Sequence, residues 1–251
     1  MKYLLSNLAT PVIVVFVALV SDPLFAANSE NEDWEYVAEI YLWGPNVDIE
    51  NPDGSNTEVK FSDLAEIARG GFMGAGFMRK GKWRFGIDAI YLEVDDRNRV
   101  PVEEGVELKE VKLQVGYVSP MVAYEFARME RSAFAVYGGA RYLWGEPTLK
   151  FKTVDPAPPG KFQASESDSG WDGFVGLHGT TWLSDKWYLG YQADIGTGDS
   201  DVTYQALGGI NYRFRSLDAT AGYRWMRWDI NSDTFEELEF NGPYLGVKIF
   251  F

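Results

Sequence analysis

The chain has 251 residues and a net charge of −14, from 23 Lys and Arg against 37 Asp and Glu. Such an acidic chain repels the phosphates of a nucleic acid, which we therefore exclude as a partner. It contains no Cys, so disulfides, thiolate chemistry and Cys-ligated metal sites are excluded as well. Aromatic residues make up 16% of the chain, with 9 Trp and 14 Tyr, which is typical of the aromatic girdles of membrane β-barrels.

The first 26 residues have the pattern of a cleaved secretory signal peptide. Lys2 precedes an apolar run at 11–20, and small residues follow near the expected cleavage point. An uncleaved membrane anchor is the alternative, but it needs roughly 20 consecutive apolar residues. Asp22 interrupts this run well before that length. We therefore expect residues 1–26 to be removed and residues 27–251 to form one domain.

The rest of the chain contains ten segments that alternate between apolar and polar residues. In the clearest of them, Trp83, Phe85 and Ile87 alternate with Arg84 and Asp88. This period of two is that of a β-strand with one apolar and one polar face. In chain order, the predicted strands cover about 34–48, 71–79, 83–94, 111–126, 134–144, 171–180, 187–195, 202–214, 217–225 and 241–251.

Two local features modify this pattern. The first long loop contains Phe61–Leu64, which predicts a capped helical turn, and the first and third loops are each long enough to contain a short hairpin. In the fourth strand the outward apolar positions include Val115 and Tyr117, whereas after Pro120 they shift to the parity of Val122. We therefore predict a β-bulge at the proline, because a bulge changes which face a strand presents.

The last strand is amphipathic and ends on an aromatic residue. Leu245, Val247, Ile249 and Phe251 share one face, and Tyr244 belongs to the other. A chain that stops on Phe at the end of such a strand resembles the closing strand of bacterial outer-membrane barrels. In those proteins this segment is the assembly signal. The resemblance implies that these five residues are recognised by the barrel-assembly machinery.

An even number of strands places both chain ends at the same side of a barrel, which in bacterial single-chain barrels is the periplasmic side. The short turns expected there are basic and contain Arg79, Lys80, Lys82, Arg128, Arg131, Lys186 and Arg215. We predict an all-β fold, an antiparallel up-and-down transmembrane β-barrel in the outer membrane of a Gram-negative bacterium. Ten strands fit best, and eight or twelve remain open because the segment at 71–79 is Gly-rich and weakly patterned.

Several short motifs resemble a broad family of uncharacterised proteobacterial outer-membrane β-barrel proteins. They cover about a third of the mature chain, with the last strand in addition. The resemblance implies a barrel fold but no activity, because the family has no catalytic signature to carry over. The motifs are Tyr41-Leu42-Trp43-Gly44-Pro45, Phe61-Ser62-Asp63-Leu64, and Arg79-Lys80-Gly81-Lys82-Trp83 continuing to Asp88-Ala89-Ile90-Tyr91-Leu92.

Ionisable residues of both signs occur at inward positions of the predicted strands. We predict that they either pair across the interior as a plug or line a water-filled path. Ten strands are close to the eight whose interior is filled by side chains, and far from the sixteen that leave a channel. This favours a filled lumen, although repeated luminal Gly residues remove bulk. The candidate lumen-lining residues are Arg84, Asp88, Lys112, Arg141, Asp172, His178, Asp194, Arg213, Arg224 and Lys248.

Two functional alternatives follow from these residues. The first is a narrow porin-like channel for small solutes or ions, in which Arg84, Arg141, Arg213 and Arg224 would set selectivity. The second is a surface hydrolase that uses His178, the only histidine, with a carboxylate such as Asp172 or Asp194. No Ser flanks the histidine, and its predicted face is luminal, so a structural role is favoured.

We expect an integral outer-membrane barrel with a structural or passive role and no catalytic activity. Its acidic loops lack calcium-loop spacing, which indicates a solvated surface rather than a metal site. We expect no cofactor and no metal. The expected partners are outer-membrane lipid, lipopolysaccharide and the barrel-assembly machinery, and the protein is expected to be a monomer.

Overall fold

The computed structural model describes residues 33–50, 54–96, 100–103, 106–153, 161–165, 168–230 and 236–251. The predicted signal peptide, residues 1–26, lies outside this part of the chain. Within the described residues, no helix is both long enough and apolar enough to cross a membrane.

Ten antiparallel strands form a closed barrel, as the sequence pattern predicts. These strands are β1 (Glu35–Trp43), β4 (Ala68–Lys80), β5 (Trp83–Asp96), β7 (Val106–Arg128), β8 (Ser132–Thr153), β10 (Asp168–Trp182), β11 (Trp187–Gly198), β12 (Val202–Arg213), β13 (Leu217–Asp229) and β14 (Glu237–Phe250). Each strand pairs with the next, and the first pairs with the last from Val37↔Phe250 to Trp43↔Tyr244. This closure leaves no open edge in the wall, as a sheet in lipid requires.

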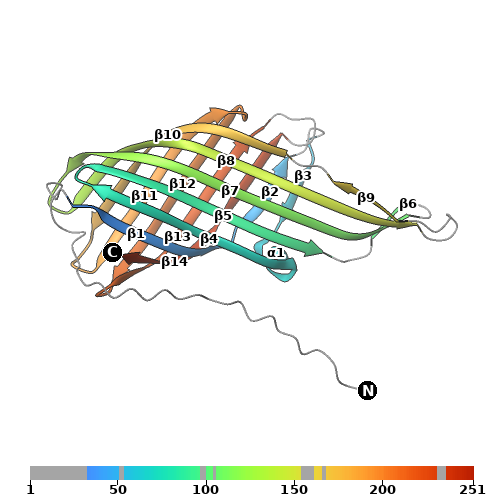
Figure 1. Ribbon diagram of the computed structural model, residues 1–251, viewed down its shortest axis with the longest axis horizontal. Coiled ribbons are helices and arrows are strands. Elements are labelled where there is room, and N and C mark those ends of the chain that lie inside the picture. Colours follow the sequence, from blue (N-terminus) through green and yellow to red (C-terminus); the bar gives the residue numbers. More distant parts are fainter. Residues whose placement is uncertain are drawn as a thin grey trace, which may run out of the picture.

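The outer face of the barrel is apolar. Leu42 is 77% exposed, and Ile40, Val175, Leu177 and Leu245 are also exposed on the outward parity of their strands. An exterior of this kind is favourable in contact with lipid and unfavourable in contact with water. The protein is therefore an outer-membrane β-barrel. The short turns and the carboxy-terminal end of β14 lie together at the left of Figure 1, which is the periplasmic end in this class of barrel.

Strand β7 differs from the sequence prediction. The pairs Val118↔Tyr142 and Met121↔Gly139 follow one uninterrupted register, so the predicted bulge at the intervening proline is wrong. The inward parity is continuous, and it places Tyr117 in the lumen, 5% exposed. The sequence pattern does not distinguish the two faces here, because the lumen is aromatic at this level and an apolar residue therefore does not indicate contact with lipid.

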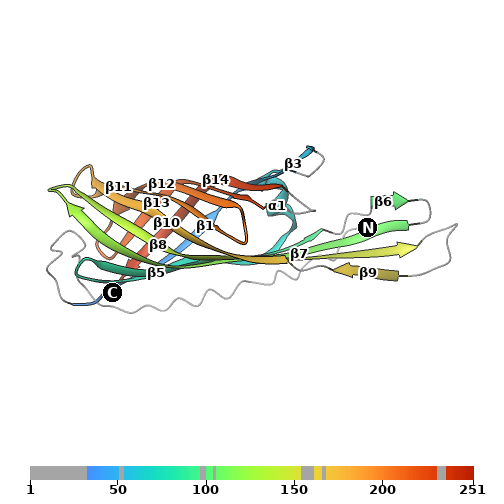
Figure 2. The ribbon, with the colours of Figure 1, turned by 90° about the horizontal axis from the view of Figure 1, so that it is seen from above.

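Strands β7 and β8 are longer than predicted, at 23 and 22 residues against 12 for β11. Beyond the barrel they are flanked by β6 (Val100–Glu103), which pairs with β7, and by β9 (Lys161–Ser165), which pairs with β8. Figure 2 shows this four-stranded extension projecting past the other loops. The sequence prediction stopped at membrane-crossing length, whereas the backbone ladder continues beyond the lipid.

The first long loop contains both a hairpin and a helix. Strands β2 (Asn46–Glu50) and β3 (Asn56–Val59) pair with each other, and β2 also continues the ladder of β14. Helix α1 (Phe61–Ile67) occupies the predicted helical turn, but the N-cap residue Lys60 makes no side-chain capping bond. The Phe61 ring lies against the backbone of Gly44, where an added Cβ would be 3.1 Å from it.

Candidate functional site

An ion-paired network crosses the lumen. Its first half centres on Arg224 from β13, which is 3% exposed. The guanidinium donates to Asp88 on β5 (Nη2 to Oδ2, 2.8 Å) and to the hydroxyl of Tyr41 on β1 (Nη1 to O, 3.1 Å). Tyr41 in turn donates to the other oxygen of Asp88, at 2.6 Å. Three strands are thereby linked through one arginine.

The second half centres on Arg141 from β8, which is 1% exposed. Its Nη2 donates to Asp194 Oδ1 on β11 at 2.7 Å, and its Nη1 donates to the hydroxyl of Thr203 on β12 at 2.9 Å. Tyr137 completes this half by donating to Asp194 Oδ2 at 2.6 Å. Each buried charge therefore has an opposite charge and further hydrogen bonds, which a buried ion pair needs to be tolerated.

Gln205 on β12 joins the two halves. Its amide oxygen accepts from Arg224 Nη2 at 2.8 Å, and its amide nitrogen donates to Asp194 Oδ2 at 3.0 Å. The result is one continuous chain of polar contacts from β5 through β13, β12 and β11 to β8. We call the side chains of Tyr41, Asp88, Tyr137, Arg141, Asp194, Thr203, Gln205 and Arg224 the luminal network.

A layer of aromatic side chains covers the luminal network on the side of the long loops. This layer consists of Trp43, Tyr117, Met226 and Trp228, which belong to one buried apolar cluster with Tyr244 and the network residue Tyr41. The Arg224 guanidinium carbon is 5.1 Å from the Trp43 ring centre and 5.3 Å from that of Tyr117. These cation–π contacts hold the guanidinium group from the side of the long loops, and the Asp88 carboxylate holds it through a hydrogen bond. The lumen is therefore filled at this level by packed side chains.

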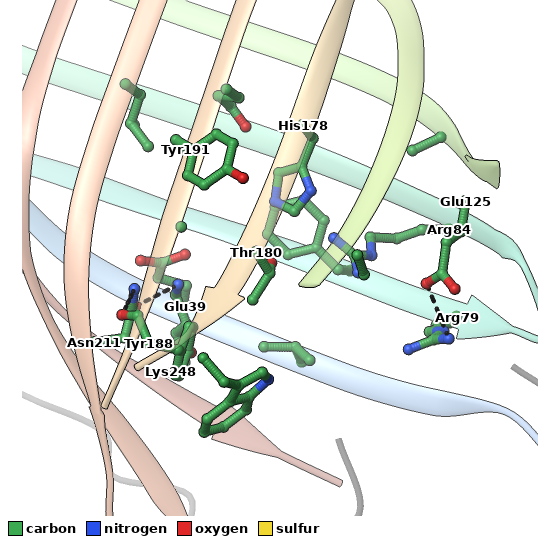
Figure 3. A pocket seen from close by; sticks show the side chains of 18 of the residues that line it. Glu39, Arg79, Arg84, Glu125, His178, Thr180, Tyr188, Tyr191, Asn211 and Lys248 are labelled. Carbon is green, nitrogen blue, oxygen red and sulfur yellow. Dashed lines mark hydrogen bonds and ion pairs between the residues drawn. The ribbon is translucent and has the colours of Figure 1, made fainter. Parts of the chain in front are cut away.

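Below the luminal network, toward the periplasmic end, lies a chamber of about 690 Å³. Its wall includes the small residues Ala75, Ala123, Ala133 and Gly190, which leave this half of the lumen unfilled. The side chains that face it are both charged and apolar, as Figure 3 shows. Those that matter for its chemistry are Glu35, Glu39, Arg79, Arg84, Glu125, His178, Tyr188, Asn211, Arg213 and Lys248.

The luminal glycines contribute less open space than their number suggests. Atoms of the Tyr244 ring lie 2.5 Å from where a Cβ would stand at Gly222, and the tyrosine hydroxyl is equally close at Gly209. The Phe77 ring covers Gly86 in the same way, at 2.4 Å. These glycines admit a neighbouring ring instead of opening a pore. Tight backbone approach of this kind is a common use of Gly in strands.

The structure gathers four of the ten candidate residues in the luminal network: Asp88, Arg141, Asp194 and Arg224. Four more line the chamber: Arg84, His178, Arg213 and Lys248. Of these, Arg213 pairs with Asp218 at 2.9 Å, and Lys248 donates to Asn211 Oδ1 at 2.9 Å.

The remaining two candidates lie away from the chamber. Asp172 accepts from the backbone nitrogen and the hydroxyl of Ser200, at 3.0 and 2.6 Å, at the end of β10 near the long loops. Lys112 lies 3.6 Å from Glu110 near the start of the extension, on the outward parity of β7. Its displacement from the lumen follows from the absence of the bulge that the sequence analysis placed in this strand.

His178 has no acid–base partner among the described residues. It forms no hydrogen bond there, and its cross-strand neighbours are Ala135 and Gln192. The two carboxylates proposed to assist it, Asp172 and Asp194, bond instead to Ser200 and Arg141. A histidine base normally needs a group that orients its ring.

Four members of the luminal network were not among the candidates: Tyr41, Tyr137, Thr203 and Gln205. All four occupy inward positions of strands that the sequence pattern identifies, so their facing could be predicted. The sequence feature that could identify the two tyrosines is an inward position in a strand, because a buried Tyr hydroxyl requires a hydrogen-bond partner. Two of them donate to the network carboxylates at 2.6 Å.

No protein-family model matches this chain, and no curated protein matches it. It is similar in structure to the outer membrane protease OmpT from Escherichia coli, with 11% identity, a TM-score of 0.48, and coverage of 89% of this chain and 100% of that one. It is also similar to the attachment invasion locus protein Ail of Yersinia pestis, with 11% identity, a TM-score of 0.38, and coverage of 88% and 99%. Likenesses this distant carry no argument about function.

Proposed function

We propose that this protein is a closed outer-membrane barrel with a structural or passive role and without catalytic activity. The observation that supports the proposal is the luminal network. Arg141 and Arg224 are almost fully buried and bonded on several sides, and we expect these contacts to block the passage of ions at this level. The absence of an orienting partner for His178 among the described residues supports the non-catalytic part.

The proposal extends to the partners of the barrel. Its apolar exterior suits outer-membrane lipid and lipopolysaccharide, and the closing strand with Tyr244, Leu245, Val247, Ile249 and Phe251 suits recognition by the barrel-assembly machinery. We propose a monomer, because the barrel closes on itself through β1 and β14. Membership of the broad proteobacterial family that the motifs resemble is part of the same proposal.

The test is single-channel recording of refolded residues 27–251 in a planar bilayer. Heat-dependent mobility on a detergent gel verifies folding first, so that silence is not caused by a misfolded sample. We expect no discrete conductance. Discrete current steps that change in size or ion preference with Arg141→Glu would refute the closed barrel and support the narrow channel.

The same preparation tests the hydrolase alternative. We expect no His178-dependent cleavage of a peptide or lipid substrate. Activity that disappears in His178→Ala, while the variant keeps the heat-dependent gel shift of the parent, would contradict the non-catalytic proposal.

A further inference from the structure

The chamber contains a guanidinium without a counter-ion. Arg84 on β5 faces the chamber and forms no hydrogen bond or ion pair with any residue that the structure describes. Its neighbour across the ladder is another arginine, Arg79. Two carboxylates belong to the same wall. Glu125 is already held by Arg79 at 3.4 Å and by Arg128 through two contacts of 2.6 Å. Glu35 stands across the ladder from Arg79, and its buried Oε2 has no hydrogen-bond partner among the described residues. The three arginines Arg79, Arg84 and Arg128 outnumber these two carboxylates, and Arg84 is the arginine without an ion pair among the described residues.

The part of the wall formed by β12, β13, β14 and β1 is closer to electrical balance. Lys248 on β14 stands directly across the ladder from Glu39 on β1 and donates to Asn211. Arg213 is paired with Asp218 through two hydrogen bonds of 2.9 and 3.0 Å. The attraction for an anion is thus localised at Arg84. His178 and Thr180 from β10 point into the same space and supply further hydrogen-bonding groups (Figure 3).

The rest of the chamber offers an apolar surface. Phe77, Met121, Leu207, Tyr188 and Phe250 contribute to its wall. Its volume of about 690 Å³ lies within the range of about 300–1,000 Å³ in which proteins bind small molecules. The luminal network closes the inner end, and the lining residues at the other end belong to the short periplasmic turns, such as Arg131 and Ser184. A ligand would therefore enter from the periplasm and leave the same way.

We propose that this chamber binds a small organic carboxylate with an apolar body, with the carboxylate on Arg84 and the apolar part against the aromatic and aliphatic wall. A guanidinium matches a carboxylate with two parallel hydrogen bonds. A phosphate dianion fits less well, because only one cation on this wall is free and Glu125 lies beside it. The proposal goes beyond a closed barrel by giving its periplasmic half a ligand.

The experiment is calorimetric titration of the refolded barrel in lipid nanodiscs with 2-naphthoate. The uncharged 2-naphthylmethanol serves as the matched ligand. We expect 2-naphthoate to bind at one site and the alcohol to bind at least about tenfold more weakly, because the alcohol lacks the charge that strengthens a hydrogen bond to a guanidinium. This comparison uses the unmodified protein, so it does not depend on the folding of a variant.

The variant to compare is Arg84→Gln, which keeps hydrogen-bonding capacity but removes the charge. We expect it to weaken 2-naphthoate binding at least about tenfold and to leave the weak binding of the alcohol unchanged. The control is Arg69→Gln, since Arg69 is an exposed arginine 3.7 Å from Asp95 and lies outside the chamber lining. It should bind 2-naphthoate as the parent does.

Three results would overturn the proposal: no binding of 2-naphthoate to the folded parent, equal binding of acid and alcohol, or unchanged binding in folded Arg84→Gln. The titration does not depend on whether the barrel conducts. A conducting barrel that binds 2-naphthoate would therefore refute the closed lumen alone, and a silent barrel that does not bind it would refute the ligand alone.

Discussion

Replacing Arg224 by Met tests whether the luminal network holds the barrel together. The substitution keeps much of the side-chain length but removes the charge and the hydrogen bonds to Asp88, Gln205 and Tyr41. Removal of one partner from a buried ion pair costs about 3–5 kcal/mol, mainly because the other charge is left buried and unpaired. Asp88 is that charge here. We therefore expect the free energy of unfolding to fall by about 3–5 kcal/mol.

The size of this effect has two internal controls. Arg227→Gln removes a partly exposed pair with Asp229 and Glu237, at 2.9 and 2.7 Å, and should cost about 0–1 kcal/mol. The double variant Arg224→Met with Asp88→Leu removes both buried charges. We expect it to regain at least about 2 kcal/mol relative to the single variant, because replacing a whole buried pair by apolar residues is often nearly neutral.

The assay is reversible unfolding by urea of the barrel refolded into lipid vesicles, followed by tryptophan fluorescence. The slope of the free energy against urea must stay the same for all variants, so that a shifted midpoint reports stability. If Arg224→Met costs no more than Arg227→Gln, the buried charges do not depend on each other as argued. If the double variant is no better than the single one, the cost does not come from the unpaired carboxylate.

Two further predictions concern the wall and the extension. Gly222→Ala should lower the free energy of unfolding by about 1–3 kcal/mol in the same assay, because its Cβ would stand 2.5 Å from the Tyr244 ring. The control is Gly208→Ala, where nothing lies within 4 Å of the added Cβ, and it should change stability by less than about 0.5 kcal/mol. Equal costs for the two variants would contradict the packing argument. In the extension, Lys150 Nζ donates to Glu110 at 2.7 Å and lowers the pKa of that carboxyl below its ordinary 4.5. This contact stabilises the extension at neutral pH and should be lost as the pH falls through the lowered pKa. Lys150→Gln should raise the pKa in an NMR titration, and an unchanged value would show that the contact is not formed.

The sequence by itself determined the kind of fold and the facing of most strands. A period of two needs only neighbouring residues, and the requirement that every backbone group in lipid be paired leaves a closed barrel as the one solution for such strands. For this reason the outward face of β14 and the inward face of β1 were predicted correctly. The pattern failed in β7, because an aromatic lumen places apolar side chains on both faces and the parity of Tyr117 then carries no information.

Tertiary structure alone decided which inward side chains meet. Arg224 and Tyr41 are 183 residues apart in sequence, and Arg224 and Asp88 are 136 apart. Their contact depends on how far each strand is staggered against the next as the sheet closes. Periodicity indicates that a residue faces the lumen. It does not give the position of that residue along the barrel axis, or the strand whose side chains it contacts. The same stagger gathers small residues in the periplasmic half and leaves Arg84 without an ion pair among the described residues, so both the luminal network and the chamber are properties of the closed barrel.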